Sequence, residues 1–150
     1  MNRLKSIFAV LAAMALILSC GKDEPVVEYL EVTPNNLAGE WKLVEWSGMA
    51  HEYTYFYIDF VRKDRKFTIY QNFDSMENMP HVVTGEFNIE EDLEKGAVIR
   101  GIYDYDEGFW TYKYEVNELT DTSMTWIAIG NPAFIQKFVR TSIPAEIKGE

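Results

Sequence analysis

Between residues 40 and 141 the chain is a series of short runs rich in Val, Ile, Thr and aromatic residues, with turn residues between them. Runs of this kind are typical of β-strands. No stretch of this region has a helical period. The sequence therefore predicts an all-β domain of eight strands, at residues 40–47, 52–62, 66–73, 82–89, 97–103, 109–118, 123–129 and 133–141.

Most of the predicted connections are short, such as residues 63–65 and 130–132. Short links between sequential strands favour antiparallel neighbours. An eight-stranded antiparallel meander loses its edge strands when it closes into a barrel, whose interior then holds side chains or one small ligand. A two-sheet sandwich is the alternative arrangement of the same strands.

The opening of the domain decides between the two arrangements. Residues 36–46 resemble the opening of lipocalin and related calycin barrels, in which a short helical turn leads into Gly-x-Trp, here Gly39-Glu40-Trp41. The resemblance covers residues 36–142 and is closest to the small lipocalin-like domains of bacterial lipoproteins. It implies an eight-stranded antiparallel up-and-down barrel in which Trp41 closes one end and Arg140, from the last strand, packs on it.

The N-terminus has the order of a secretory signal peptide, because Arg3 and Lys5 precede an uncharged, almost wholly apolar run at residues 7–18. That run is shorter than the about 20 residues that a membrane-spanning helix needs. Leu18-Ser19-Cys20 followed by Gly21 resembles the bacterial lipoprotein box, which implies that Cys20, the only cysteine, is acylated, for example with palmitate. An ordinary signal peptide with an incidental cysteine is the alternative.

These features divide the chain into a signal peptide (1–19), a lipidated cysteine and tether (20–36), the barrel (37–142) and a C-terminal tail (143–150). Residues 22–24, Lys-Asp-Glu, are similar to a signal that sends some lipoproteins of Bacteroidota-type bacteria to the outer face of the outer membrane. We therefore expect a lipid anchor in the outer membrane and, further, exposure at the cell surface. A generic acidic tether is the alternative.

The excess of acidic residues argues against negatively charged partners. Without residues 1–19 the chain keeps 12 Lys and Arg residues against 24 Asp and Glu residues. Nucleic acids and anionic lipids are bound by clustered basic residues, so neither is an expected partner.

The period of two along each strand predicts which residues face inward. On the second strand the more apolar face is Phe56, Ile58 and Phe60. Applied to the other strands, the rule predicts a further interior set: Trp41, Leu43, Phe67, Ile69, Phe87, Ile89, Trp110, Tyr112, Tyr114, Val116, Met124, Trp126 and Phe138. At the end opposite Trp41 and Arg140 we predict ligand-binding residues: Phe56, Gln71, Val83, Trp110, Tyr112, Trp126 and Phe134.

Two alternatives stay open at this point. So many aromatic side chains can fill the interior of a short barrel and leave no cavity. The outward stripe Tyr53, Tyr55, Tyr57 and Tyr70 is either a platform for a protein or glycan partner or plain β-propensity.

The predicted mouth of the barrel is acidic. Its segments, 45–56, 71–83, 103–110 and 128–136, contain no Lys or Arg and seven acids: Glu45, Glu52, Asp74, Glu77, Asp104, Asp106 and Glu107. A ring of this kind repels anions and favours neutral or cationic apolar ligands. The alternative is a solubility ring or a loose divalent-cation site, with His51 and His81 nearby.

Catalysis is not expected, because the chain has two His residues and no Gly-x-Ser-x-Gly nucleophile motif. No metal site or cofactor is expected either. Residues 104–108 resemble the start of a calcium loop, with Glu115 at its twelfth position, but the glycine is fifth where the loop requires it sixth. We interpret this segment as a turn.

Two functions follow. The first is a membrane-anchored lipoprotein whose lipocalin-like barrel binds a small, largely apolar, neutral or cationic molecule. The second is a filled barrel that serves as a protein or glycan interaction subunit at the cell surface. A cavity below about 300 Å³ would favour the second, because ligand pockets are usually larger.

Overall fold

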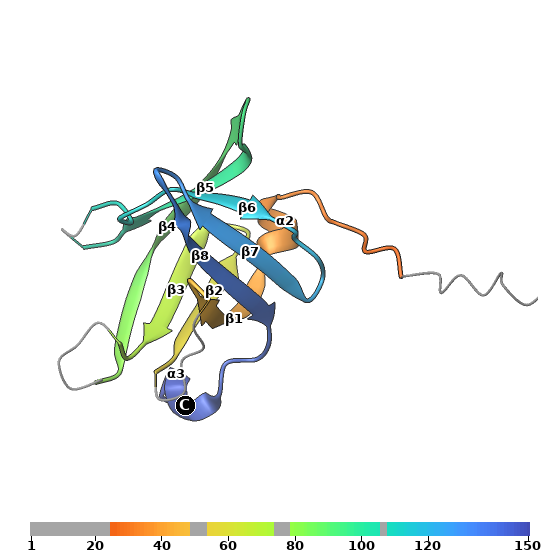
Figure 1. Ribbon diagram of the computed structural model, residues 1–150. Helices are drawn as coiled ribbons and strands as arrows, with labels where there is room; N and C mark the ends of the chain where they lie inside the picture. The colour runs from red at the N-terminus through yellow and green to blue at the C-terminus, as the bar shows by residue number, and fades with distance from the viewer. Residues whose placement is uncertain (1–24, 49–53, 74–78, 106–107) are drawn as a thin grey trace, which may run out of the picture.

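The computed structural model describes residues 25–48, 54–73, 79–105 and 108–150. Eight strands in this part of the chain form one closed barrel in sequence order, with all neighbours antiparallel and β8 pairing back to β1 (Figure 1). The predicted barrel is confirmed, and the sandwich is excluded. The strands are β1 (Gly39–Trp46), β2 (Phe56–Val61), β3 (Lys66–Gln71), β4 (His81–Asp92), β5 (Gly96–Tyr103), β6 (Tyr114–Asn117), β7 (Ser123–Ala128) and β8 (Asn131–Arg140).

The observed strand bounds differ from the predicted ones most clearly in β4. This strand continues three residues beyond the predicted end at residue 89, and with β5 it forms a hairpin that projects from the barrel (Figure 1). The Asp92 carboxylate accepts hydrogen bonds from the backbone N–H groups of Glu94 and Lys95, which fixes the turn. The extension is polar on both faces, so no apolar alternation marks it in the sequence.

β6 is the opposite case, since it is much shorter than the predicted run at residues 109–118. Phe109 forms only an isolated bridge with Ile102, and regular pairing begins again at Tyr114. Between them, the Trp110 ring lies over Gly101, where an added Cβ atom would be 2.0 Å from Trp110 Cε2. β2 is shorter too, because residues 54 and 55 precede the strand.

The barrel interior holds the residues that the period of two placed there. Each of these residues is either buried or half-buried and packed against the core. Tyr57 departs from the rule in one respect, since it faces outward and is nevertheless buried. Lys42 Nζ lies 5.7 Å from its ring centroid and the Tyr55 ring lies 6.0 Å away.

One end of the barrel is closed by α2 (Pro34–Leu37) together with Trp41 and Arg140. The Trp41 indole is fully buried and donates to the Leu37 carbonyl oxygen at 2.8 Å. The Arg140 guanidinium lies 4.1 Å from the Trp41 ring centroid. The structure therefore brings together the two residues that the resemblance assigned to the closed end.

Gly39 is required at this end for two reasons. Its φ of +110° is a conformation that residues with a side chain rarely adopt. A Cβ atom at this position would also lie 2.8 Å from Arg140 Nη1. The glycine of the Gly-x-Trp motif thus makes room for the guanidinium group that packs on the tryptophan.

Both terminal segments of the described chain contact the barrel. The Leu30 N–H donates to the Leu119 carbonyl oxygen at 2.7 Å, and Leu30 packs against the core. At the other end, α3 (Ala145–Lys148) places Lys148 Nζ 2.6 Å from Glu40 Oε1, and the Ile143 N–H donates to Glu40 Oε2. The folded unit therefore reaches beyond residues 37–142 on both sides.

Within the described ranges, no helix is long and apolar enough to cross a membrane. The predicted signal peptide and Cys20 lie outside the described residues.

Candidate ligand-binding pocket

The end of the barrel opposite Trp41 contains a pocket of about 490 Å³. Nine of its described lining residues are aromatic, two are isoleucines and three are uncharged polar residues. None of the described lining residues is charged. They are Trp46, Phe56, Ile58, Ile69, Gln71, Phe73, Tyr103, Trp110, Thr111, Tyr112, Tyr114, Trp126, Phe134 and Gln136.

Six of the seven residues predicted to bind a ligand line this pocket: Phe56, Gln71, Trp110, Tyr112, Trp126 and Phe134. Val83 is the exception. It is buried in the core, but its cross-strand partner Ile69 lines the pocket instead. Val83 is therefore a core residue here and not part of the described pocket wall.

Several lining residues were not among the predicted binding residues. Gln136 carried a usable signal, because it alternates with Phe134 and Phe138 on the inward face of β8. Nothing in the sequence marked Trp46 as inward-facing, because Trp41 and Leu43 place the odd positions of β1 on the inner face and Trp46 is at an even position. The register shifts between Leu43 and Glu45, and this bulge turns the even position inward.

Aromatic rings pack on one another around the pocket. Near the mouth, the Trp46 ring centroid lies 5.0 Å from that of Phe73 and 5.2 Å from that of Phe134. Deeper inside, the Trp126 ring lies 5.2 Å from Tyr114 and 5.6 Å from Trp110. Ring pairs at these separations attract each other beyond their apolar burial. The pocket wall is therefore held in place by its own contacts.

The polar groups of the pocket wall are uncharged. Burial of Tyr114, assisted by the neighbouring Tyr103 and Tyr112, raises the pKa of its phenol above the ordinary value, so the hydroxyl stays protonated. The indole N–H groups of Trp110 and Trp126 are buried without a hydrogen-bond partner in the described part of the chain.

Only two of the seven acids predicted around the mouth, Glu45 and Asp104, lie among the described residues. Glu45 pairs with Lys137 Nζ at 3.1 Å. Asp104 lies 3.6 Å from Lys66 Nζ and accepts a hydrogen bond from the Thr84 hydroxyl. Lys137 directly follows the segment 128–136, and Lys66 is the first residue of β3, so each of these two acids is partly neutralised by a lysine from outside the predicted mouth. The other five lie outside the described residues: Glu52, Asp74, Glu77, Asp106 and Glu107.

The described residues contain no group of His, Cys, Asp or Glu side chains that could hold a metal ion. His81 begins β4, and His51 lies outside the described residues. In the segment that resembles a calcium loop, the Tyr103 N–H donates to the Gly108 carbonyl oxygen at 2.9 Å, which is a turn contact.

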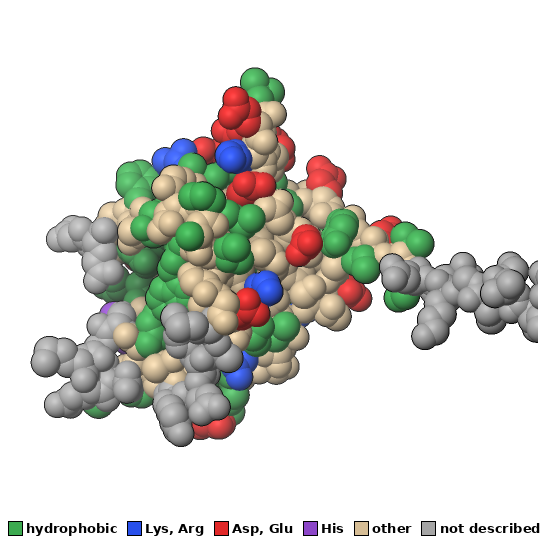
Figure 2. All heavy atoms as spheres, in the orientation of Figure 1, with side chains coloured by type: hydrophobic (Ala, Val, Ile, Leu, Met, Phe, Trp, Pro, Cys, Tyr) green, Lys and Arg blue, Asp and Glu red, His purple; other side chains and the backbone are tan. Residues whose placement is uncertain are grey.

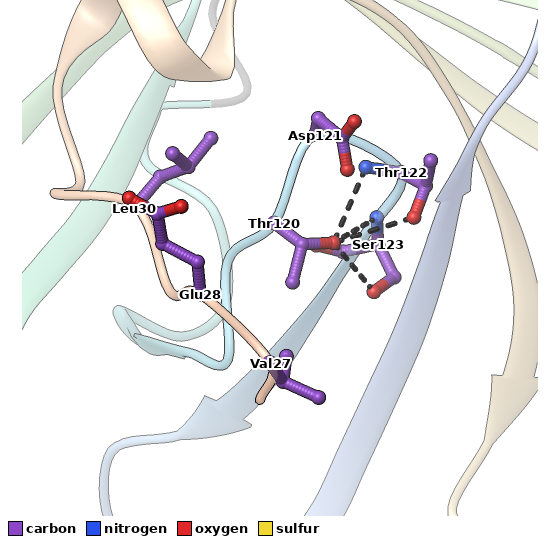
Figure 3. A pocket seen from close by; sticks show the side chains of 7 residues that line it. All are labelled: Val27, Glu28, Leu30, Thr120, Asp121, Thr122 and Ser123. Atoms are coloured by element: carbon purple, nitrogen blue, oxygen red, sulfur yellow. Dashed lines mark hydrogen bonds between the residues drawn. The ribbon is translucent and has the colours of Figure 1, made fainter. Parts of the chain in front are cut away.

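A second pocket, of about 500 Å³, lies between the N-terminal segment and the turn from β6 to β7 (Figure 3). The Thr120 hydroxyl in this turn accepts hydrogen bonds from the backbone N–H groups of Thr122 and Ser123. These polar groups are therefore used within the turn itself. With few apolar side chains in its wall, this pocket is the weaker candidate for an apolar ligand.

The outward tyrosines do not form an open platform in the described chain. Tyr57 is buried, and Tyr55 and Tyr70 are half-buried. Tyr53 lies outside the described residues. Figure 2 shows hydrophobic side chains gathered in a band on one face of the barrel and acidic side chains on the projecting β4–β5 hairpin.

A family model described as a lipocalin-like domain matches residues 37–126. Comparisons with curated proteins and with solved structures found no match.

Proposed function

Because the chain belongs to the family of lipocalin-like domains, we propose that its barrel binds a small, largely apolar molecule in the pocket at the open end. The observation that carries the proposal is the pocket itself. Its volume of about 490 Å³ exceeds the lower bound of the usual range for ligand sites, and its wall is mostly aromatic. A barrel filled by its own side chains would leave no such space.

Binding rather than catalysis fits this wall. None of its described residues is a carboxylate, histidine or lysine that could serve as a general acid or base. The family is also generally one of binding proteins.

The charge of the ligand follows from the same wall. No Lys or Arg among the described lining residues could compensate a carboxylate, and burying an unpaired charge is strongly unfavourable. Fatty acids are therefore poor candidates. A neutral apolar molecule is favoured by the wall, and a cationic one only by the acids predicted around the mouth.

The test uses Nile red, a neutral apolar dye, and the same substitution in each of the two pockets. Thr111, which is exposed, lines the pocket at the open end, and Thr122, also exposed, lines the pocket of Figure 3. We expect saturable blue-shifted fluorescence with the full-length chain, weakened about tenfold by Thr111→Trp because the indole narrows the mouth.

Thr122→Trp is the matched control and should leave the affinity unchanged. Weakening by Thr122→Trp instead of Thr111→Trp would move the site to the other pocket. An absence of saturable binding would contradict the proposal. Native mass spectrometry of the protein from its own host would then identify a retained molecule, or a protein partner if the alternative function holds.

We further propose that the barrel is anchored to the outer membrane through lipid on Cys20 and is exposed at the cell surface. The support is the lipoprotein box around Cys20 and the Lys-Asp-Glu sequence at residues 22–24. Several acyl chains give a permanent anchor, since each buried methylene contributes about 0.8 kcal/mol. Metabolic labelling with a palmitate analogue should be lost in Cys20→Ala, and undiminished labelling of that variant would refute the anchor.

A further inference from the structure

Gln136 is one of the few buried polar residues of the barrel, and it lies in the pocket wall. Its side chain is only 6% exposed and faces inward between Phe134 and Phe138. No hydrogen bond joins its side chain to another group in the described part of the protein. Because Gln136 lines the pocket, the surface that it retains is directed to the pocket. The amide atoms of Gln136 are not among the fully enclosed polar atoms of the described residues, so the amide is open to the pocket and can bond a group of a ligand there.

Tyr114 has the same character. It is 8% exposed, lines the pocket, and its hydroxyl has no hydrogen-bond partner among the described residues. Both residues adjoin Trp126, since Gln136 pairs with it across β7 and β8 and the Tyr114 ring lies 5.2 Å from its ring. The buried Trp126 N–H also lacks an acceptor in this part of the chain. Three strands thus bring uncharged, unpartnered polar groups to one place in an aromatic wall.

Each of these groups has a defined hydrogen-bonding capacity. An amide donates from nitrogen and accepts at oxygen, and a phenol hydroxyl does both. Neither carries a charge, and no described lining residue does. The wall therefore compensates a carbonyl or hydroxyl group of a ligand and does not compensate a carboxylate or an ammonium group. The neighbouring aromatic rings of the wall pack well against a flat or apolar surface of a ligand.

We propose that Gln136 and Tyr114 form a neutral polar anchor that selects ring-containing apolar molecules bearing an uncharged carbonyl or hydroxyl group. This inference rests on the proposed ligand-binding function and goes further, because it names the chemical class of the ligand and the residues that recognise it. The aromatic wall accommodates the ring system, and the anchor determines which polar substituent is accepted.

The test compares three probes that share one ring system, substituted at the same carbon: ethylnaphthalene, acetylnaphthalene and naphthoate. Equilibrium dialysis with the full-length chain measures each affinity. We expect the ketone to bind about five- to tenfold more tightly than the hydrocarbon, as one buried hydrogen bond provides. The carboxylate should bind most weakly.

Gln136→Met removes the amide and keeps the length of the side chain. In this variant the ratio of ketone to hydrocarbon affinity should fall toward one. The melting temperature of the ligand-free protein should not fall, because no hydrogen bond between the Gln136 side chain and a described protein group is lost. Tyr114→Phe is the second variant and should also reduce the ratio. Lys137→Met is the matched control, since it places the same side chain on the outer face one residue along β8.

The outcomes separate the two proposals. If all three probes fail to bind, the ligand-binding function is refuted, and this inference with it. If the hydrocarbon binds as tightly as the ketone, or naphthoate binds best, the anchor is refuted while the binding function stands. A marked fall in melting temperature for Gln136→Met would show that the amide has a structural partner, and would also refute the anchor.

Discussion

Replacing Arg140 with methionine tests the closed end of the barrel. The guanidinium donates to the carbonyl oxygens of Ala38, Asn36 and Asp121 at 2.6, 2.8 and 2.8 Å, and it stacks on Trp41. Methionine retains the apolar stem and loses all four interactions. The carbonyls of Ala38 and Asn36 are then left, part-buried, without a donor.

The magnitude follows from these contacts. About 1 kcal/mol for each of the two part-buried hydrogen bonds and about 1 kcal/mol for the cation–π contact give about 3 kcal/mol. For a chain of this size, that corresponds to a fall in melting temperature of about 6–12 °C. Thermal unfolding followed by circular dichroism measures it. Arg140→Lys should recover little, because one ammonium group cannot reach three carbonyls in these directions.

Lys137→Met is the control, since it removes a cation from the same strand. Lys137 is half exposed and, within the described ranges, forms an ion pair with Glu45, and exposed ion pairs contribute little. Its melting temperature should stay close to that of the parent chain. If Arg140→Met melts within a degree or two of Lys137→Met, Arg140 does not hold the closed end.

Three further stability measurements test other contacts of the barrel. Gly39→Ala should lower the melting temperature more than Gly48→Ala, because both glycines have a positive φ but only the first would place a Cβ atom against Arg140. The pKa of the Glu40 carboxyl is lowered, chiefly by its hydrogen bond from Lys148. The stability that the charged carboxyl contributes is therefore present above the ordinary pKa of 4.5 and is lost as pH falls through the lowered value. Glu40→Gln should destabilise the protein at neutral pH and progressively less in acid. Asp59 has a pKa raised by burial and then by Glu40, so its charged form opposes folding; Asp59→Asn should stabilise at neutral pH, and the gain should disappear as pH falls through the raised value. Unchanged melting curves of these last two variants across that pH range would contradict both assignments.

The period of two was sufficient to predict the barrel interior from the sequence, because one face of almost every strand is buried. Ile58, Phe67 and Trp126 lie where alternation places them. The closed end was predictable for a different reason, since Gly-x-Trp and a late arginine together resemble a known arrangement. The antiparallel order of the strands then predicted one end of the barrel for the seven candidate binding residues, and six of them line the pocket at that end.

The places where the strands depart from the period of two could not be predicted from the sequence. The bulge in β1 that turns Trp46 inward changes no residue type, so nothing in the sequence marks it. Regular pairing on this side begins only at Tyr114, and just before it the Trp110 ring lies over Gly101 of β5, a long-range contact that no local pattern in the sequence indicates. The polar extension of β4 is stabilised by backbone pairing and by the Asp92 turn, and neither leaves an apolar pattern.

The filled interior and the ligand pocket were alternatives in the sequence, but the structure contains both at different depths. Toward the closed end the interior is filled, with the Phe60 ring 4.9 Å from that of Phe87 and the Trp126 ring 4.6 Å from that of Phe138. Toward the open end the rings of Trp46 and Phe134 border a space instead of filling it. Because Trp126 belongs to both levels, it joins the rigid core to the floor of the pocket. A ligand that reaches Gln136 would therefore bind against a surface held by the core, and little of its binding free energy would be spent on ordering the protein.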